Sequence, residues 1–216
     1  QGIATAPVDV DNLVRRIPLL YKTPDGWLAS FGTQVLKVLA GADTYVIKTN
    51  QNGIEEVRVK GVPPAKVDSL GRKWVSWVTP HETTLQEMDV EGRFVFVGTN
   101  AAGILPQLAT PVGLLEPHYI QAALAESILQ PDSPYIPDYS LAAEVLIYVG
   151  TVSLIWLLIT KLGVIWGVLS ALLLFSGTAY AGVQLIANGV LIDVVWALIS
   201  QILASTVAFY LNYRTQ

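Results

Sequence analysis

Two consecutive arginines, Arg15 and Arg16, are the residues of this sequence best suited to hold an anion. A guanidinium presents its N–H donors in a plane, so two of them side by side could clamp a carboxylate or a phosphate. The same pair could instead form a solvated or ion-paired strand edge. Both interpretations place the arginines in an extended segment, which we expect over residues 13–21.

Other arrangements that could support chemistry are incomplete. Gly98 and Gly103 bracket four residues as in a phosphate loop, but no Lys-Ser/Thr pair follows, so a tight strand-exit turn is the favoured interpretation. His81-Glu82 has no second metal ligand at helical spacing, and His118 opens a predicted helix. The sequence has no GxSxG elbow, no HExxH motif and no evident pair of catalytic carboxylates. It therefore predicts a non-enzymatic chain without cofactor or metal.

The charged residues are few and unevenly distributed. They make up 14% of the 216 residues, against roughly 25% in an average globular domain. Only four of the 30 lie in 141–216, namely Glu144, Lys161, Asp193 and Arg214. This distribution predicts a polar N-terminal part in water and an apolar C-terminal part in a membrane.

Charge and cysteine content exclude several classes of function. The first 140 residues carry 11 basic and 15 acidic side chains, which argues against a nucleic-acid partner because such proteins cluster Lys and Arg. The sequence contains no cysteine, which excludes disulfides, thiolate catalysis and Cys-type metal sites.

Three apolar stretches are long enough to cross a bilayer, since about 20 residues of helix span its roughly 30 Å core. We place them at 141–160, 162–187 and 190–211, with Lys161 between the first two and the turn signal Asn188-Gly189 between the last two.

The basic flanks predict the orientation of these spans. Lys161 and Arg214 flank the spans on one side, so the positive-inside rule puts both in the cytoplasm. The N-terminal domain then faces the opposite, extracytoplasmic side, and the C-terminus faces the cytoplasm. Because export needs a signal, we also expect another membrane helix upstream of Gln1.

Two features of the apolar part have alternative interpretations. Gly163, Gly167 and Ala171 are spaced by four, which is either a stripe for close helix packing or the ordinary small-residue content of membrane helices. Glu144 and Asp193 lie near the outer boundary, either as interfacial anchors or in an ion-related role.

The N-terminal part mixes strand and helix signals, which predicts an α/β domain with a mixed sheet over 1–130, followed by a proline-rich linker over 131–140 and the membrane helices over 141–216. We expect a turn at Thr23–Gly26, helices at Trp27–Ala40, Glu82–Met88 and His118–Leu129 (the last amphipathic), a hairpin of Thr44–Thr49 with Ile54–Lys60, a turn at Asp68–Gly71, and strands at Lys73–Val78 and Arg93–Val97.

Four segments, in order, carry a resemblance to a known family. Residues 9–19 read DVDNLVRRIPL, residues 67–74 hold an Asp and a Gly-Arg pair before Trp74, residues 92–103 read GRFVFVGTNAAG, and residues 109–113 read ATPVG. These are similar to signature motifs of the CHASE2 domain, beginning with its DxDGxxRRxPL. The match extends over residues 9–130, and three membrane helices directly after the domain are usual in that family.

The resemblance implies an extracytoplasmic sensor module of a bacterial receptor, commonly followed in the family by a cytoplasmic output domain. On its motifs we take five residues as candidate ligand contacts: Arg15, Arg16, Asn100, Thr110 and Gln121. The sequence departs from the pattern at three places. Asn12 replaces a glycine, 105–108 are uncharged where the family tends to be charged, and Gln121 replaces a histidine.

Two functional hypotheses follow. The first is a sensory signal-input domain with a ligand still to be identified. The second is an accessory structural subunit of a larger membrane complex, with a degenerate ligand site and no output domain. In both cases we expect the partners to be the lipid bilayer and other membrane-protein subunits or a second copy of the chain, with no nucleic acid.

Overall fold

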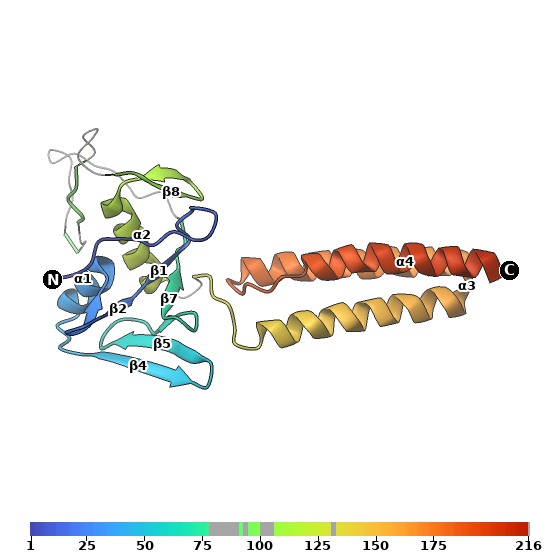
Figure 1. Ribbon diagram of the computed structural model, residues 1–216, viewed down its shortest axis with the longest axis horizontal. Helices are drawn as coiled ribbons and strands as arrows, with labels where there is room; N and C mark the ends of the chain where they lie inside the picture. The colour runs from blue at the N-terminus through green and yellow to red at the C-terminus, as the bar shows by residue number, and fades with distance from the viewer. Residues whose placement is uncertain (78–90, 93–94, 100–105, 131–132, 216) are drawn as a thin grey trace. The chain divides into compact units, whose positions relative to one another are not determined.

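The computed structural model describes residues 1–77, 91–92, 95–99, 106–130 and 133–215. These residues belong to two compact units, Gln1–Tyr135 and Ile136–Gln216. In the part that the structure describes, the first unit contains short strands and two helices, and the second contains long apolar helices (Figure 1). This arrangement confirms the predicted α/β domain followed by three helices that could span a membrane.

The elements of the first unit are short. In chain order they are β1 (Arg16–Pro18), β2 (Leu20–Thr23), β3 (Gly26–Ala29), α1 (Phe31–Leu39), β4 (Tyr45–Asn50), β5 (Gly53–Val59), β6 (Ala65–Lys66), β7 (Arg72–Trp74), β8 (Leu108–Thr110), β9 (Gly113–Leu115) and α2 (Pro117–Leu129). The described strands form the antiparallel groups β1-β7, β2-β3, β4-β5-β6 and β8-β9. A parallel bridge joins Ile3 to Ser30.

The three predicted turns of this unit are confirmed, because each depends on local residues. The β2-β3 hairpin turns at Pro24-Asp25, and β4 pairs with β5 around Gln51-Asn52. At the third turn the N–H of Gly71 donates to the carbonyl of Asp68 at 2.8 Å.

Helix α1 begins four residues later than predicted. The apolar spacing from Trp27 onward is compatible with a helix, but the backbone from Gly26 to Ala29 pairs with β2 instead. Ser30 then caps the helix, since its Oγ accepts from the N–H of Thr33 at 3.4 Å. Gly41 follows the helix with a φ of 60°, a left-handed conformation that glycine adopts without strain.

Helix α2 contributes to the core of the first unit, and its predicted amphipathic pattern is weak. Ile120, Leu124 and Ile128 are buried along one side, and the polar residues Gln121 and Ser127 are buried on that same side. The helix packs against α1 and the inner residues of β1 and β5, which together form one hydrophobic core. The opposite side, which carries Ala122 and Glu126, is only partly buried, so the helix has one covered face that includes polar side chains.

Two predicted strands differ from the structure. Strand β7 ends at Trp74, because the N–H of Ser76 donates to Ser127 Oγ of α2 at 2.9 Å rather than to a neighbouring strand. Residues 95–97 form no strand, and the Val95 and Val97 side chains are exposed, so an apolar run here did not predict burial. The predicted helix at Glu82–Met88 lies outside the described residues.

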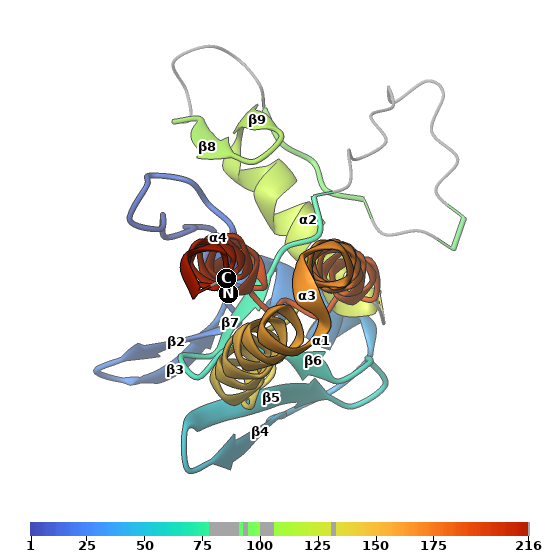
Figure 2. The ribbon, with the colours of Figure 1, turned by 90° about the vertical axis from the view of Figure 1, so that its right-hand side faces the viewer.

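The second unit contains α3 (Ser140–Ala187) and α4 (Val195–Thr215). Helix α3 folds back on itself: a Cβ built on Gly167 would lie only 3.2 Å from the Cα of Ile159, whereas eight residues of straight helix rise about 12 Å. The two halves of α3 therefore run antiparallel and pack with α4, as the end-on view shows (Figure 2).

Three segments of the described residues are long and apolar enough to cross a membrane, namely Ser140–Leu162, Ile165–Ala187 and Val195–Asn212. The third begins at Val195, not at residue 190 as predicted. Asp193 forms a local turn just before this helix, in which its Oδ1 accepts from the N–H of Val195 at 2.8 Å. The predicted turn at Asn188-Gly189 is present, with Gly189 at a φ of 73°.

Candidate functional site

The two arginines follow a tight loop that begins at Asp9. The Asp9 N–H donates to the carbonyl of Leu13, and the Asn12 N–H donates to the carbonyl of Asp9, both at 2.9 Å. Asn12 has a φ of 62°, in the left-handed region that asparagine tolerates better than most residues. Asn12 thus holds a left-handed turn that a glycine would also adopt without strain.

Arg15 is paired with the carboxylate of Asp11. Its two terminal nitrogens donate to the two Asp11 oxygens at 2.8 and 2.6 Å, a bidentate contact, and Asp9 lies 3.9 Å away. The hydrogen bonds from Arg15 lower the pKa of the Asp11 carboxyl, and the same hydrogen bonds raise the pKa of Arg15. Both side chains therefore remain ionised together over a wide pH range.

Arg16 is enclosed more closely. Its guanidinium contacts Asp9 at 2.5 Å and Asp68 at 3.5 Å, and it lies over the ring of Trp74 at 5.3 Å from the ring centroid. Asp68 in turn pairs with Arg72 at 2.7 Å. The antiparallel register of β1 and β7, which places Arg16 opposite Trp74, brings these residues together across more than 50 positions of sequence.

We call this group the arginine–aspartate cluster: Asp9, Asp11, Arg15, Arg16, Asp68, Arg72 and Trp74. Its three carboxylates balance its three guanidiniums, so the geometry is that of an ion-paired strand edge. An incoming anion would have to displace an aspartate. Sequence reasoning identified only the two arginines, although the resemblance motifs contain every other member.

Two N–H donors of the cluster have no acceptor. Arg16 Nε and Trp74 Nε1 are buried and make no hydrogen bond. Buried donors without a partner carry a free-energy cost. An acceptor group placed against either N–H would remove that cost.

Thr110 ends strand β8, and its side chain bonds within its own hairpin rather than to the cluster. Its hydroxyl donates to the carbonyl of Gly113 at 2.6 Å and closes the β8-β9 turn. The N–H of Val14 donates to the carbonyl of Ala109 at 2.8 Å, which joins this hairpin to the segment before the arginines. Asn100 lies outside the described residues.

Gln121 lies apart, in the core of the first unit. It is fully buried. Its Oε1 accepts from the N–H of Gly32 at 3.0 Å, and its Nε2 donates to the carbonyl of Ala4 at 3.3 Å. The side chain thus joins α2 to the start of α1 and to the N-terminal segment, and the structure does not bring it together with Arg15 and Arg16.

His118 and Gly98 form a contact that sequence reasoning did not anticipate. A Cβ on Gly98 would overlap the imidazole ring of His118. The ring also lies 4.3 Å from that of Tyr119, and its Nδ1 is buried without a partner. Glycine at 98 is therefore needed for close approach to the ring rather than for a phosphate loop.

Lys73 is a buried cation between Arg72 and Trp74 in strand β7. Because side chains alternate along a strand, it points to the opposite face from these two members of the cluster. The residue is only 2% exposed. Burial, with a smaller contribution from the charge of Lys66, lowers its pKa from 10.5 to about 8. Such a group is costly to bury in the charged form.

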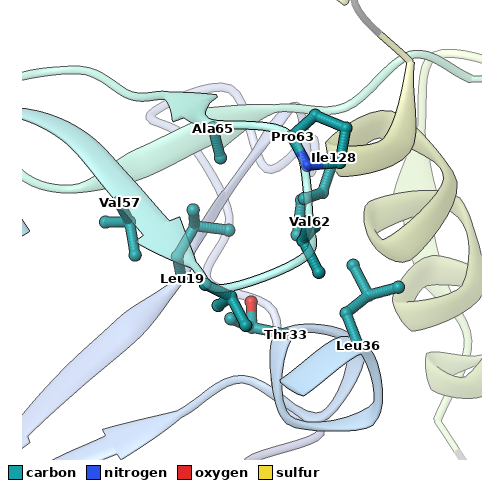
Figure 3. Close-up of a pocket in the computed structure, with 9 residues that line it drawn as sticks. Leu19, Thr33, Leu36, Val57, Val62, Pro63, Ala65 and Ile128 are labelled. Atoms are coloured by element: carbon teal, nitrogen blue, oxygen red, sulfur yellow. The ribbon is translucent and has the colours of Figure 1, made fainter. Parts of the chain in front are cut away.

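The cavity in the core of the first unit is too small for a ligand. It measures about 10 Å³ and is lined mainly by apolar side chains, among them Leu19, Val57 and Ile128 (Figure 3). A cavity of that size holds at most one water molecule. Among the described residues, no three His, Cys, Asp or Glu side chains gather as a metal site.

In the second unit the three small residues have different surroundings. Gly163 lies in α3 where the helix reverses, and Gly167 packs against Ile159 and Phe209. Ala171 lines a groove between α3 and α4. Glu144 and Asp193 are in contact, since Glu144 Oε1 accepts from the Asp193 N–H at 3.0 Å.

Comparison with known proteins identifies one family. The family model described as the CHASE2 domain matches residues 1–164, which is most of the chain. No curated protein and no solved structure matches this chain.

Proposed function

This chain belongs to the CHASE2 domain family, and from that premise we propose that it acts as the extracytoplasmic signal-input part of a bacterial membrane receptor without catalytic activity of its own. The match to the CHASE2 family model supports the sensor role, and the three apolar helices indicate a membrane protein. We further propose that the membrane is the bacterial inner membrane and that the C-terminus faces the cytoplasm, on the basis of Lys161 and Arg214.

The arginine–aspartate cluster is the proposed input site. Arg16 Nε and Trp74 Nε1 offer two buried donors to an acceptor on a ligand. Binding there would compete with the contacts that Arg16 makes to Asp9 and Asp68, both close to β1 and β7. An acidic or carbonyl-bearing small molecule is the chemical class that fits. Thr110 and Gln121 then stabilise the domain rather than bind the ligand.

A reporter chimera tests this proposal. An adenylate cyclase catalytic domain is fused after Gln216, with a membrane helix before Gln1, and cyclic AMP is measured in cells at matched protein level. We expect Arg16→Ala to change cyclase output several-fold relative to the unchanged chimera. The matched control is Arg58→Ala, since Arg58 is half exposed and pairs with Glu56 outside the cluster. Equal output from all three chimeras would contradict an input role for the cluster.

The second candidate is an accessory subunit of a larger membrane complex. One observation favours it: the position of the family's histidine is Gln121, whose amide is used inside the core. In this role the chain would bind its partners through surfaces of its helices. Purification of the full chain from its native membrane in mild detergent, followed by native mass spectrometry, separates the roles. Stoichiometric companion subunits without any change of cyclase output in the chimera would favour the accessory subunit.

A further inference from the structure

A groove runs between the second half of α3 and α4, and it contains a buried polar atom without a partner. The groove has a volume of about 290 Å³ and is lined mostly by apolar side chains, including Ala171 and Phe175 from α3 and Ile202 and Phe209 from α4. Gln201 also lines it and is only 1% exposed. Its Oε1 accepts no hydrogen bond.

The chain uses the neighbouring hydroxyls for other contacts. Gln201 Nε2 donates to Thr178 Oγ1 at 2.9 Å, and Thr178 donates its own proton to the carbonyl of Leu174 at 2.8 Å. Ser205, one turn along α4, donates to the carbonyl of Ile202 at 2.9 Å. Neither hydroxyl has a proton left for Gln201 Oε1, so these two neighbours do not supply the donor that it lacks.

The chemistry of the groove limits what can supply that donor. Gln201 lies six residues into the third span, within the apolar part of a bilayer, where an unsatisfied acceptor is costly. A lipid acyl chain carries no donor. A water molecule needs two to four polar partners, whereas the groove is mostly apolar and far larger than the roughly 30 Å³ that one water occupies.

We propose that this groove receives a transmembrane helix of a separate polypeptide, which presents a hydrogen-bond donor to Gln201 Oε1. Ala171, a small residue in the wall, allows the backbone of an incoming helix to approach closely, as small residues do at helix interfaces in membranes. The donor is a side-chain hydroxyl, amide or indole N–H at the depth of Gln201. This inference is independent of whether the chain is a receptor or an accessory subunit.

Photo-crosslinking of the full chain in its native membrane tests the proposal. A benzophenone side chain is placed at Ile202, which lines the groove and is 54% exposed, or at Leu203, which is 62% exposed and does not line it. We expect the Ile202 probe to attach to a transmembrane segment of another polypeptide, identified by mass spectrometry, at least fivefold more than the Leu203 probe.

Two substitutions separate the groove contact from a role inside this chain. Gln201→Leu removes the acceptor and is expected to lower the yield at Ile202 about three- to tenfold, the range of one hydrogen bond between membrane helices. Thr178→Val removes the partner of Nε2 but leaves Oε1, and it should change the yield by less than twofold. The proposal is overturned by equal loss in both variants, by adducts with lipid alone or with a second copy of this chain, or by no adduct at Ile202.

Discussion

The side chain of Gln121 in α2 accepts a hydrogen bond from the backbone N–H of Gly32 in α1 at 3.0 Å, across 89 residues of sequence. The same amide donates to the carbonyl of Ala4. One buried glutamine thus satisfies an N–H in the first turn of α1 and fixes the N-terminal segment beside it.

Replacement of Gln121 by leucine should therefore destabilise the protein. The Gly32 N–H would remain buried without an acceptor, which costs about 1–3 kcal/mol. We expect a lower midpoint of thermal unfolding for the full chain in detergent. Gln51→Leu is the matched control, because Gln51 is exposed in the β4-β5 turn. An unchanged midpoint for Gln121→Leu would show that the amide contacts contribute nothing.

Lys73 should make stability depend on pH. The folded pKa of about 8 lies below the ordinary 10.5, so the unfolded chain holds more protons between these values and stability rises as the pH increases from about 8 to about 10.5. At pH 7 the buried charge lowers the free energy of unfolding by up to about 3 kcal/mol. We expect Lys73→Met to be more stable than the parent at pH 7 and to lose this advantage by pH 10.5.

The measurement is the midpoint of thermal unfolding at pH 7, 9 and 10.5 for both chains. Lys60→Met serves as the control, because Lys60 is exposed. If Lys73→Met is no more stable at pH 7, or if its advantage does not shrink with rising pH, the cost assigned to the buried ammonium is wrong.

Gly98→Ala should destabilise the fold through His118. The added Cβ would overlap the imidazole ring, and such overpacking costs typically about 1–3 kcal/mol. Truncation of the ring removes the overlap, so the double variant Gly98→Ala/His118→Ala should be no less stable than His118→Ala alone. A thermal double-mutant cycle measures this coupling. Additive losses from the two substitutions would rule out the contact.

The membrane orientation can be read with single cysteines, since the chain has none of its own. With Asn188→Cys in intact cells, we expect reaction with an impermeant thiol reagent added from outside, because the loop after α3 would face the periplasm. Lys161→Cys should react only after the cells are opened. The reverse pattern would invert the proposed topology.

Local chemistry in the sequence predicted turns and spans better than strands. Gly41, Gly71 and the turn at Asn188-Gly189 were identified correctly because a turn depends on the residues that form it. Trp27 and Val97 were misassigned because apolar spacing says nothing about which strand is available for pairing. The membrane segments followed from composition alone, but the turn that Asp193 forms just before α4 depends on side-chain geometry.

The candidate site was predicted only in part for the same reason. Arg15 and Arg16 stand out as an adjacent pair, and Asp11 is four residues from Arg15. Asp68 and Trp74 reach Arg16 only through the register of β1 with β7. That register is a tertiary property, so the charge balance of the cluster could not be read from the sequence.

The contact between Glu144 and Asp193 links the start of the first span to the start of the third. Glu144 lies in the first turns of the first span. The Asp193 N–H, which donates to its carboxylate at 3.0 Å, lies just before α4. A shift of the first span by a single residue, about 1.5 Å along its axis, would lengthen this hydrogen bond unless the Glu144 side chain or the start of α4 moved with it. The length of this one contact therefore reports the axial position of the first span relative to the third.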